Sequence, residues 1–154
     1  MAVAVLNLQQ RVKVPAPRLR RLAEAALGAL GRAGAEVHLT FVNDALARRL
    51  NRQYRGVSRA TDVLAFPLVT PGPSRLLGEV IVSVETATRH ARRIGVPVVR
   101  ELELLVVHGL LHLVGYDDRE PREARLMHER TRGILRKALG PIQDRLWTGL
   151  LTPA

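Results

Sequence analysis

Leu-Leu-Val-Val-His-Gly-Leu-Leu-His-Leu-Val-Gly-Tyr-Asp-Asp, residues 104–118, is the stretch around which the rest of the chain is expected to fold. As far as Val114, the only residues in it that are not large and apolar are His108, Gly109 and His112. A segment that is apolar on every side predicts a buried helix. A buried imidazole costs free energy unless a partner satisfies it. A single histidine in such a helix is usually a hydrogen-bonded core residue, but two of them require a further explanation.

The spacing of the two histidines indicates a metal ion. His108 and His112 are four residues apart, so on a helix they lie on one face, about one turn from each other. Gly115 is suited to the left-handed conformation that commonly ends a helix, and the chain can then turn back to bring Asp118 toward the two rings. The pattern His-x3-His-x5-Asp therefore predicts a site of two imidazoles and one carboxylate.

Asp118 also has a purely structural interpretation. Either Asp117 or Asp118 is a suitable N-cap for the next helix, because aspartate is favoured at that position. The residues that follow, Glu120, Pro121 and Glu123, are typical of a first helical turn. The sequence leaves the ligand and the cap as alternatives.

Three segments resemble one known family. Residues 108–118, HGLLHLVGYDD, are similar to the HGxLHLxGYDH signature of the YbeY family, which are bacterial metalloendoribonucleases of ribosomal RNA maturation and ribosome quality control. Residues 51–56 (NRQYRG) followed by 61–67 (TDVLAFP), and residues 77–82 (LGEVIV), fit the same family. The resemblance implies a single-strand-specific endoribonuclease with one zinc ion, acting in 16S rRNA 3′-end maturation on RNA of the small ribosomal subunit.

The chain departs from the family signature at its last position, where Asp118 stands in place of a third histidine. Three protein ligands leave a tetrahedral ion one position for water, and zinc lowers the pKa of such a water to about 7. An anionic ligand reduces the net charge of the site from about +2 to about +1, because one carboxylate replaces a neutral imidazole. We therefore expect zinc, with manganese or iron as alternatives that this ligand set accepts more readily.

Composition limits the possible classes of protein. The 154 residues predict one domain spanning 1–154. No apolar stretch approaches twenty residues and no signal-peptide pattern opens the chain, so a cytoplasmic protein without membrane association is expected. The sequence leaves the oligomeric state open, and a monomer is the working expectation. There is no cysteine, which excludes thiolate metal sites and disulfides. The formal net charge of +10 favours a polyanionic partner such as RNA.

Arginines cluster in the segment that follows the second expected strand. Five of them, with no acid among them, lie within twelve residues: Arg48, Arg49, Arg52, Arg55 and Arg59. A solvated helix face is the simple interpretation, but cations this dense favour an RNA phosphate track. The resemblance places Arg55, in the Tyr-Arg-Gly segment, near the metal, which implies that with His108 and His112 it is catalytic and holds the scissile phosphate.

Hydrophobic periodicity predicts an α+β fold. Strands are expected at residues 2–8, 36–42, 63–68 and 79–84, and helices at about 18–32, 43–53, 84–94, 97–114 and 122–139. This order indicates one small mixed sheet covered by about five helices; four strands and a zincin-like metal helix also follow from the resemblance. Strand 79–84 is expected to be half-buried, His38 and Thr40 to point away from the core, and His90 to be solvated among arginines.

Two rival functions remain open at this stage. A zincin-type peptidase also places two histidines one turn apart, but its general base is a glutamate directly after the first one, where this chain has Gly109. The second rival is a non-catalytic, ribosome-associated RNA-binding protein whose structural metal has His128 as a fourth ligand.

The chain contains few aromatic residues on which RNA bases could stack: two Phe, two Tyr and one Trp. We therefore expect RNA to be bound through its backbone charge, with little sequence preference.

Overall fold

The computed structural model of the chain describes residues 2–54, 63–68 and 76–147. Its strands are β1 (Val3–Asn7), β2 (Glu36–Val42), β3 (Val63–Pro67) and β4 (Leu76–Ser83). Its helices are α1 (Ala16–Ala29), α2 (Asp44–Tyr54), α3 (Val84–Ile94), α4 (Val98–Leu113) and α5 (Pro121–Leu139), followed by a short 3-10 helix, η1 (Asp144–Trp147). The predicted α+β class, the four strands and the five helices are confirmed.

The sheet is mixed, with strand order β1-β2-β4-β3. β1 pairs with β2 and β2 with β4 in parallel, whereas β3 runs antiparallel to β4 along the edge. β4 begins at Leu76, three residues before the predicted start. The register with β2 shifts there, since Glu36 faces Leu76 and Val37 faces Gly78. Gly78 has a φ of +150°, and a Cβ on it would lie 2.2 Å from the carbonyl oxygen of Phe66, so only glycine fits this irregularity.

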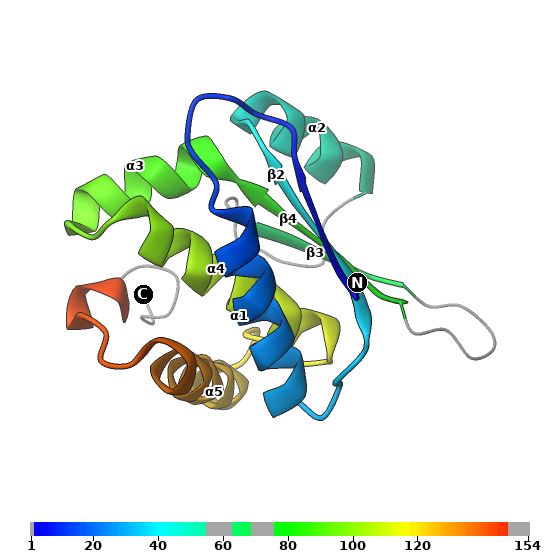
Figure 1. Ribbon diagram of the computed structural model, residues 1–154, viewed down its shortest axis with the longest axis vertical. Helices are drawn as coiled ribbons and strands as arrows, with labels where there is room; N and C mark the ends of the chain where they lie inside the picture. The colour runs from blue at the N-terminus through cyan, green and yellow to red at the C-terminus, as the bar shows by residue number, and fades with distance from the viewer. Residues whose placement is uncertain (1, 55–62, 69–75, 148–154) are drawn as a thin grey trace.

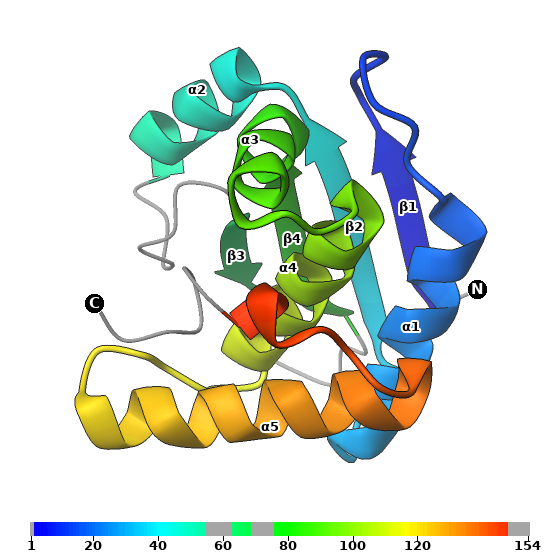
Figure 2. The ribbon, with the colours of Figure 1, turned by 90° about the vertical axis from the view of Figure 1, so that its left-hand side faces the viewer.

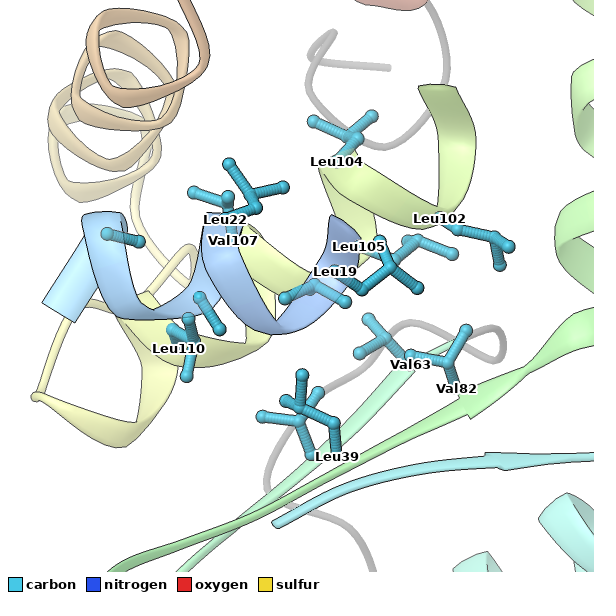
Figure 3. Close-up of a cluster of buried hydrophobic side chains, with 14 of the residues drawn as sticks. Leu19, Leu22, Leu39, Val63, Val82, Leu102, Leu104, Leu105, Val107 and Leu110 are labelled. Atoms are coloured by element: carbon cyan, nitrogen blue, oxygen red, sulfur yellow. The ribbon is translucent and has the colours of Figure 1, made fainter. Parts of the chain in front are cut away.

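One face of the sheet forms the main core. Figure 3 shows Leu39, Val63 and Val82 pointing toward the apolar side chains of α1 and α4, and all three are fully buried. In Figures 1 and 2, α1, α4 and α5 lie on this side of the sheet, with α4 in the middle. α4 contacts α1, α3, α5, β3 and β4, which explains why its sequence from Leu104 onward is apolar on every side.

The opposite face is covered at one end by α2 (Figure 1). Val42, Leu64 and Ile81 pack there against Ala47 of α2. β4 is therefore buried on both faces over this part, and the prediction of a half-buried strand was wrong: Ile81 is 3% exposed. A central strand loses its solvent face when a helix covers it, and the sequence of the strand alone does not report that helix. Thr40 is also buried, and its hydroxyl donates to Glu79 at 2.8 Å, whereas His38 is exposed as predicted.

Two glutamates of α4 are buried beneath the neighbouring helices. Glu103 is paired with Arg18 at 3.1 Å and also with Arg100. Oε2 of Glu101 lies 3.0 Å from Nδ1 of His90 on α3. The prediction that His90 is solvated was therefore wrong, because its face of α3 packs on α4 and meets a buried carboxylate. Within the described ranges, none of the helices combines the length and apolar character that crossing a bilayer requires.

Candidate metal centre

The two histidines of α4 lie side by side in the interior. Their Nε2 atoms are 3.1 Å apart, and the ring centroids are 4.7 Å apart with the planes at 81°. His108 is 1% exposed and His112 is 6% exposed. The helical spacing predicted from the sequence thus aims one nitrogen of each ring at the same point, at the end of α4 where the chain leaves the core.

The turn after α4 brings a carboxylate to this point. Gly115 has a φ of +107°, and its amide donates to the carbonyl of His112 at 3.1 Å. After the turn, Oδ2 of Asp118 lies 3.9 Å from Nε2 of His108. One donor atom from each of the three residues, His108, His112 and Asp118, lies within 4.8 Å of the other two. The structure therefore brings together the three residues that the sequence pattern selects.

Neither aspartate of the turn is the N-cap of α5. The N-cap is Glu120, whose side chain makes no capping hydrogen bond. Asp117 is turned toward its neighbours: its Oδ1 accepts the backbone N–H of Asp118 at 2.7 Å, and its Oδ2 lies 3.1 Å from Nε of Arg119. The capping interpretation of Asp118 is thereby removed, because the helix starts two residues too late for it.

The environment keeps His108 neutral. Burial, and secondarily the charge of a protonated His112, lowers the pKa of His108 from 6.5 to about 3. A neutral imidazole has a free lone pair on one ring nitrogen, which is the form that ligates a metal ion. The distance between the rings suits one N–H···N hydrogen bond between the two Nε2 atoms. For both Nε2 atoms to bind an ion, the proton of the donating ring would move to its Nδ1.

The donor set fits a small divalent cation. Two nitrogens at about 2.0–2.1 Å from a tetrahedral zinc ion are about 3.3 Å from each other, and the observed separation is 3.1 Å. Two imidazoles and a carboxylate are also ligands that manganese and iron accept. Nδ1 of His108 is buried without a hydrogen-bond partner among the described residues, so packing, rather than a second hydrogen bond, orients this ring.

Gly109 shows why the site lacks the base of a peptidase. A Cβ at this position would lie 2.5 Å from Cγ1 and 3.0 Å from Cγ2 of Val80 on β4. The position therefore faces the sheet, and the space in which a glutamate side chain would start is occupied. The close contact between α4 and the sheet therefore leaves no room for the peptidase glutamate at this position.

His128 is placed elsewhere. Its ring lies against Trp147 of η1, with centroids 6.3 Å apart, and Arg132 stacks over the same indole at 5.1 Å. Among the residues that the structure describes, the only group with metal-ligand geometry consists of His108, His112 and Asp118. The arrangement gives no support to His128 as a fourth ligand that would close the coordination shell.

The arginines of α2 are exposed, as a phosphate track requires: Arg48, Arg49 and Arg52 all face solvent. Arg55 and Arg59, the other two residues of the predicted track, lie outside the described residues. The single acid of α2 is Asp44, and its carboxylate pairs with Arg89 of α3.

Asp44 fastens α2 to α3, a role that the sequence did not indicate. Its Oδ1 accepts hydrogen bonds from Ser83 and Thr86 at 2.6 Å each, and its Oδ2 pairs with Arg89 at 2.8 Å. Burial alone raises the pKa of Asp44, but these partners outweigh it and lower the pKa to about 2. The cap of α2 is Asn43, whose Oδ1 accepts the N–H of Leu46 at 2.8 Å.

Comparison with known proteins gives consistent matches. The family model described as Endoribonuclease YbeY matches residues 4–139. The Endoribonuclease YbeY of Anaeromyxobacter sp. (strain Fw109-5) is 48% identical over 128 residues, covering 82% of this chain and 67% of that protein. The Endoribonuclease YbeY of Pelotomaculum thermopropionicum is 41% identical over 145 residues, covering 88% and 95%.

A solved structure agrees with the fold. The solution structure of TM1509 from Thermotoga maritima superposes with a TM-score of 0.61 at 28% sequence identity, covering 90% of this chain and 89% of that one. The Endoribonuclease YbeY of Anaeromyxobacter dehalogenans (strain 2CP-C) is 47% identical to this chain, but the match covers only 63% of that protein's length. The chain thus matches some relatives over nearly their whole length and spans about two thirds of others.

Proposed function

The chain belongs to the YbeY family of endoribonucleases, and from this premise we propose that it is a metal-dependent endoribonuclease that cleaves single-stranded RNA. The observation that carries the proposal is the group formed by the buried His108 and His112 and the half-buried Asp118, whose donor atoms all lie within 4.8 Å of one another. The exposed arginines of α2 and the net charge of +10 supply the attraction for an RNA backbone.

Each residue of the centre has a distinct role in this proposal. His108 and His112 each present one ring nitrogen to the same cation, and burial holds the pKa of His108 far below neutrality, so that its imidazole is neutral. Asp118 adds a negatively charged oxygen ligand from the turn that follows α4. A divalent ion held there supplies Lewis acidity toward a phosphodiester and lowers the pKa of a coordinated water.

The arginines position the substrate. Arg55 holds the scissile phosphate and offsets negative charge that grows during cleavage. Arg48, Arg49, Arg52 and Arg59 bind neighbouring phosphates, and guanidinium groups suit this task since each offers paired N–H donors to two oxygens. Contacts of this kind carry no base information, so we propose cleavage with little sequence preference of its own.

We propose zinc as the ion, with manganese or iron as functional replacements. With the carboxylate of Asp118, the site is a harder ligand set and carries less positive charge than a site of three imidazoles. The affinity for zinc should therefore exceed the affinities for manganese and iron by a smaller factor. The substrate that we propose is 16S rRNA near its 3′ end, reached within the cytoplasm as part of small-subunit maturation and quality control. We further propose that the chain acts as a single domain and a monomer, with the ribosome presenting the cleavage site.

Cleavage of a labelled single-stranded RNA, with zinc or manganese added back to metal-free protein, tests the function. We expect activity in the wild type, loss of at least about 100-fold in His112→Ala because a ligand is removed, and a comparable loss in Arg55→Ala with metal content unchanged. His38→Ala, an exposed substitution on the sheet, is the matched control and retains activity. Equal activity in wild type and His112→Ala, or cleavage insensitive to chelation, contradicts the proposal.

A further inference from the structure

The sheet face opposite the metal helix is left partly open. α2 covers one end of it, and of the helices that the structure describes none lies over the rest (Figure 1). Beside the covered end, Leu6 of β1 is 54% exposed and Leu8, just beyond the strand, is 49% exposed. These are large apolar side chains at an edge strand, where soluble proteins ordinarily place polar residues.

Strand register aligns one residue of each strand across this face, of which Leu6 is exposed while Thr40, Ile81 and Leu64 are buried. Leu6 is aligned with Thr40 on β2, Thr40 with Ile81 on β4, and Ile81 with Leu64 on β3. Since alternate residues of a strand share a face, this row crosses the whole sheet on the side away from α4. A groove of ≈ 450 Å³ runs along it. Its apolar lining comes from three strands, the segment after β1, and α2: Leu6, Leu8, Leu46, Leu50, Phe66 and Ile81.

One basic residue of α2 lies beside the groove. Leu46, Arg49, Leu50 and Gln53 follow the i, i+3, i+4, i+7 spacing that places residues on one stripe of a helix. The two leucines of that stripe line the groove, so the exposed Arg49 lies at its margin. Arg48 and Arg52 lie on the outer side of α2 by the same spacing. The floor contains one acid, Glu79, whose Oε2 accepts the hydroxyl of Thr40 at 2.8 Å.

We propose that this groove docks an acidic amphipathic segment of a partner protein. The apolar side of the segment fills the space between α2 and the leucines of β1, and its acidic flank faces Arg49. The shape of the site favours this occupant, because an amphipathic helix or strand fits a hollow while a membrane surface does not. The groove is separate from the metal centre, which lies on the other face of the sheet, but Arg49 is also one of the arginines that we propose for RNA binding.

Other occupants fit the groove less well. RNA bases bind open sheets by stacking on aromatic side chains, and Phe66 is the one aromatic side chain of this lining. A phosphate backbone also gains nothing from aliphatic leucines or from Glu79. A second copy of this chain would bring two arginine-bearing helices together, with +10 on each molecule, and like charges across an interface are unfavourable.

The test is a titration followed by amide NMR shifts of the folded full-length chain. The probe is a synthetic helical peptide of about 16 residues, with leucines at i, i+3, i+4 and i+7 and glutamates on its other positions. A second peptide keeps the leucines and replaces every glutamate by lysine. We expect the acidic peptide to shift the amides of Leu6, Leu8, Thr40 and Phe66, and the basic peptide to leave them unchanged.

Substitutions then locate the binding. We expect Leu8→Glu to weaken the acidic peptide at least about tenfold and Leu8→Lys to weaken it much less, since both disturb packing but one repels the flank. Arg49→Glu should weaken it about fivefold and Arg48→Glu less than about twofold. Leu8 is exposed, so amide spectra of its variants should remain those of a folded chain. RNA cleavage by Leu8→Glu should equal that of wild type.

Several results would overturn the proposal. Equal binding of the two peptides means nonspecific apolar contact, and shifts confined to residues outside the groove place the binding elsewhere. If single-stranded RNA displaces the acidic peptide and itself changes the amide shifts of the same groove residues, the face is assigned to RNA instead. Binding of anionic phosphatidylserine vesicles that Leu8→Glu abolishes assigns it to lipid, and a dimer at high concentration that Leu8→Glu dissociates assigns it to a second copy.

Discussion

Replacing Gly109 by alanine tests how tightly the metal helix is set against the sheet. The added Cβ would lie 2.5 Å from Cγ1 of Val80, whereas two carbons in contact are separated by about 3.5–4.0 Å. The overlap of about 1 Å or more meets a stiff, branched side chain on a fully buried central strand. Overpacking of this kind costs about 1–3 kcal/mol, and the upper end applies here.

A gain in helix propensity opposes the overlap. Alanine is favoured over glycine inside a helix by about 1 kcal/mol, so the expected net loss for Gly109→Ala is about 2 kcal/mol. In a chain of this size that corresponds to about 4–8 °C in melting temperature. Urea denaturation of metal-free protein measures the loss without a contribution from ligand binding.

A double-mutant cycle with Val80→Ala isolates the contact. In the wild-type background Val80→Ala should cost about 2 kcal/mol by leaving a cavity. In the Gly109→Ala background the same change should cost close to nothing, since the new methyl group fills the space that the valine leaves. A coupling energy of at least about 1 kcal/mol is therefore expected. Additive changes, or a Gly109→Ala variant as stable as wild type, would refute the close approach of α4 to β4.

Three further predictions concern the centre and its surroundings. First, metal-free protein should lose about 2 kcal/mol of stability between about pH 7 and pH 5, because the unfolded chain protonates His108 near pH 6.5 while the folded chain, in which its pKa is about 3, does not. Chemical denaturation across this pH range measures the loss, and the same dependence of stability on pH in His108→Gln would exclude this histidine as its source. Second, Asp118→Ala should weaken zinc binding by more than the about 10–100-fold typical of an outer-shell change, and Asp118→His should raise the preference for zinc over manganese; calorimetric titration with each ion decides, and wild-type affinity in Asp118→Ala removes the carboxylate from the site. Third, RNA affinity should fall about 20- to 100-fold between about 50 and 200 mM salt, as for three to five phosphate contacts with a single strand; a fluorescence anisotropy titration that shows no salt dependence would contradict the arginine track.

Sequence alone located most elements because their periodicity is local. The apolar run of α4 and the spacing of its histidines needed no knowledge of distant residues, and the predicted helix at 84–94 agrees with α3 (Val84–Ile94). The metal turn was also accessible, since a glycine and an aspartate at fixed spacing follow the helix. These features depend on contacts within a few residues.

The errors concern contacts between segments that are far apart. His90 was expected in solvent, yet its ring meets Glu101, a residue on the next helix whose own burial depends on the fold. The buried second face of β4 depends on α2, which follows a different strand. The sequence does not link Asp44 to Ser83 and Thr86, because these hydrogen-bond donors lie about forty residues further along the chain.

The choice between cap and ligand for Asp118 shows the same limit. Asp, Glu and Pro in succession suit a helix start at several neighbouring positions, and local preference does not select among them. The structure starts α5 at Pro121 and leaves the carboxylate of Asp118 beside the imidazoles. The ligand geometry is thus a consequence of where one helix ends and the next begins.

X-ray absorption spectroscopy of protein purified without chelator or nickel affinity, together with its metal content, addresses the main claim most directly. We expect one divalent ion per chain, bound by two imidazole nitrogens and one carboxylate oxygen, and no ion in His112→Ala. Protein that is supplied with metal but binds no ion at this position, with His108 and His112 hydrogen-bonded to each other, would contradict the account.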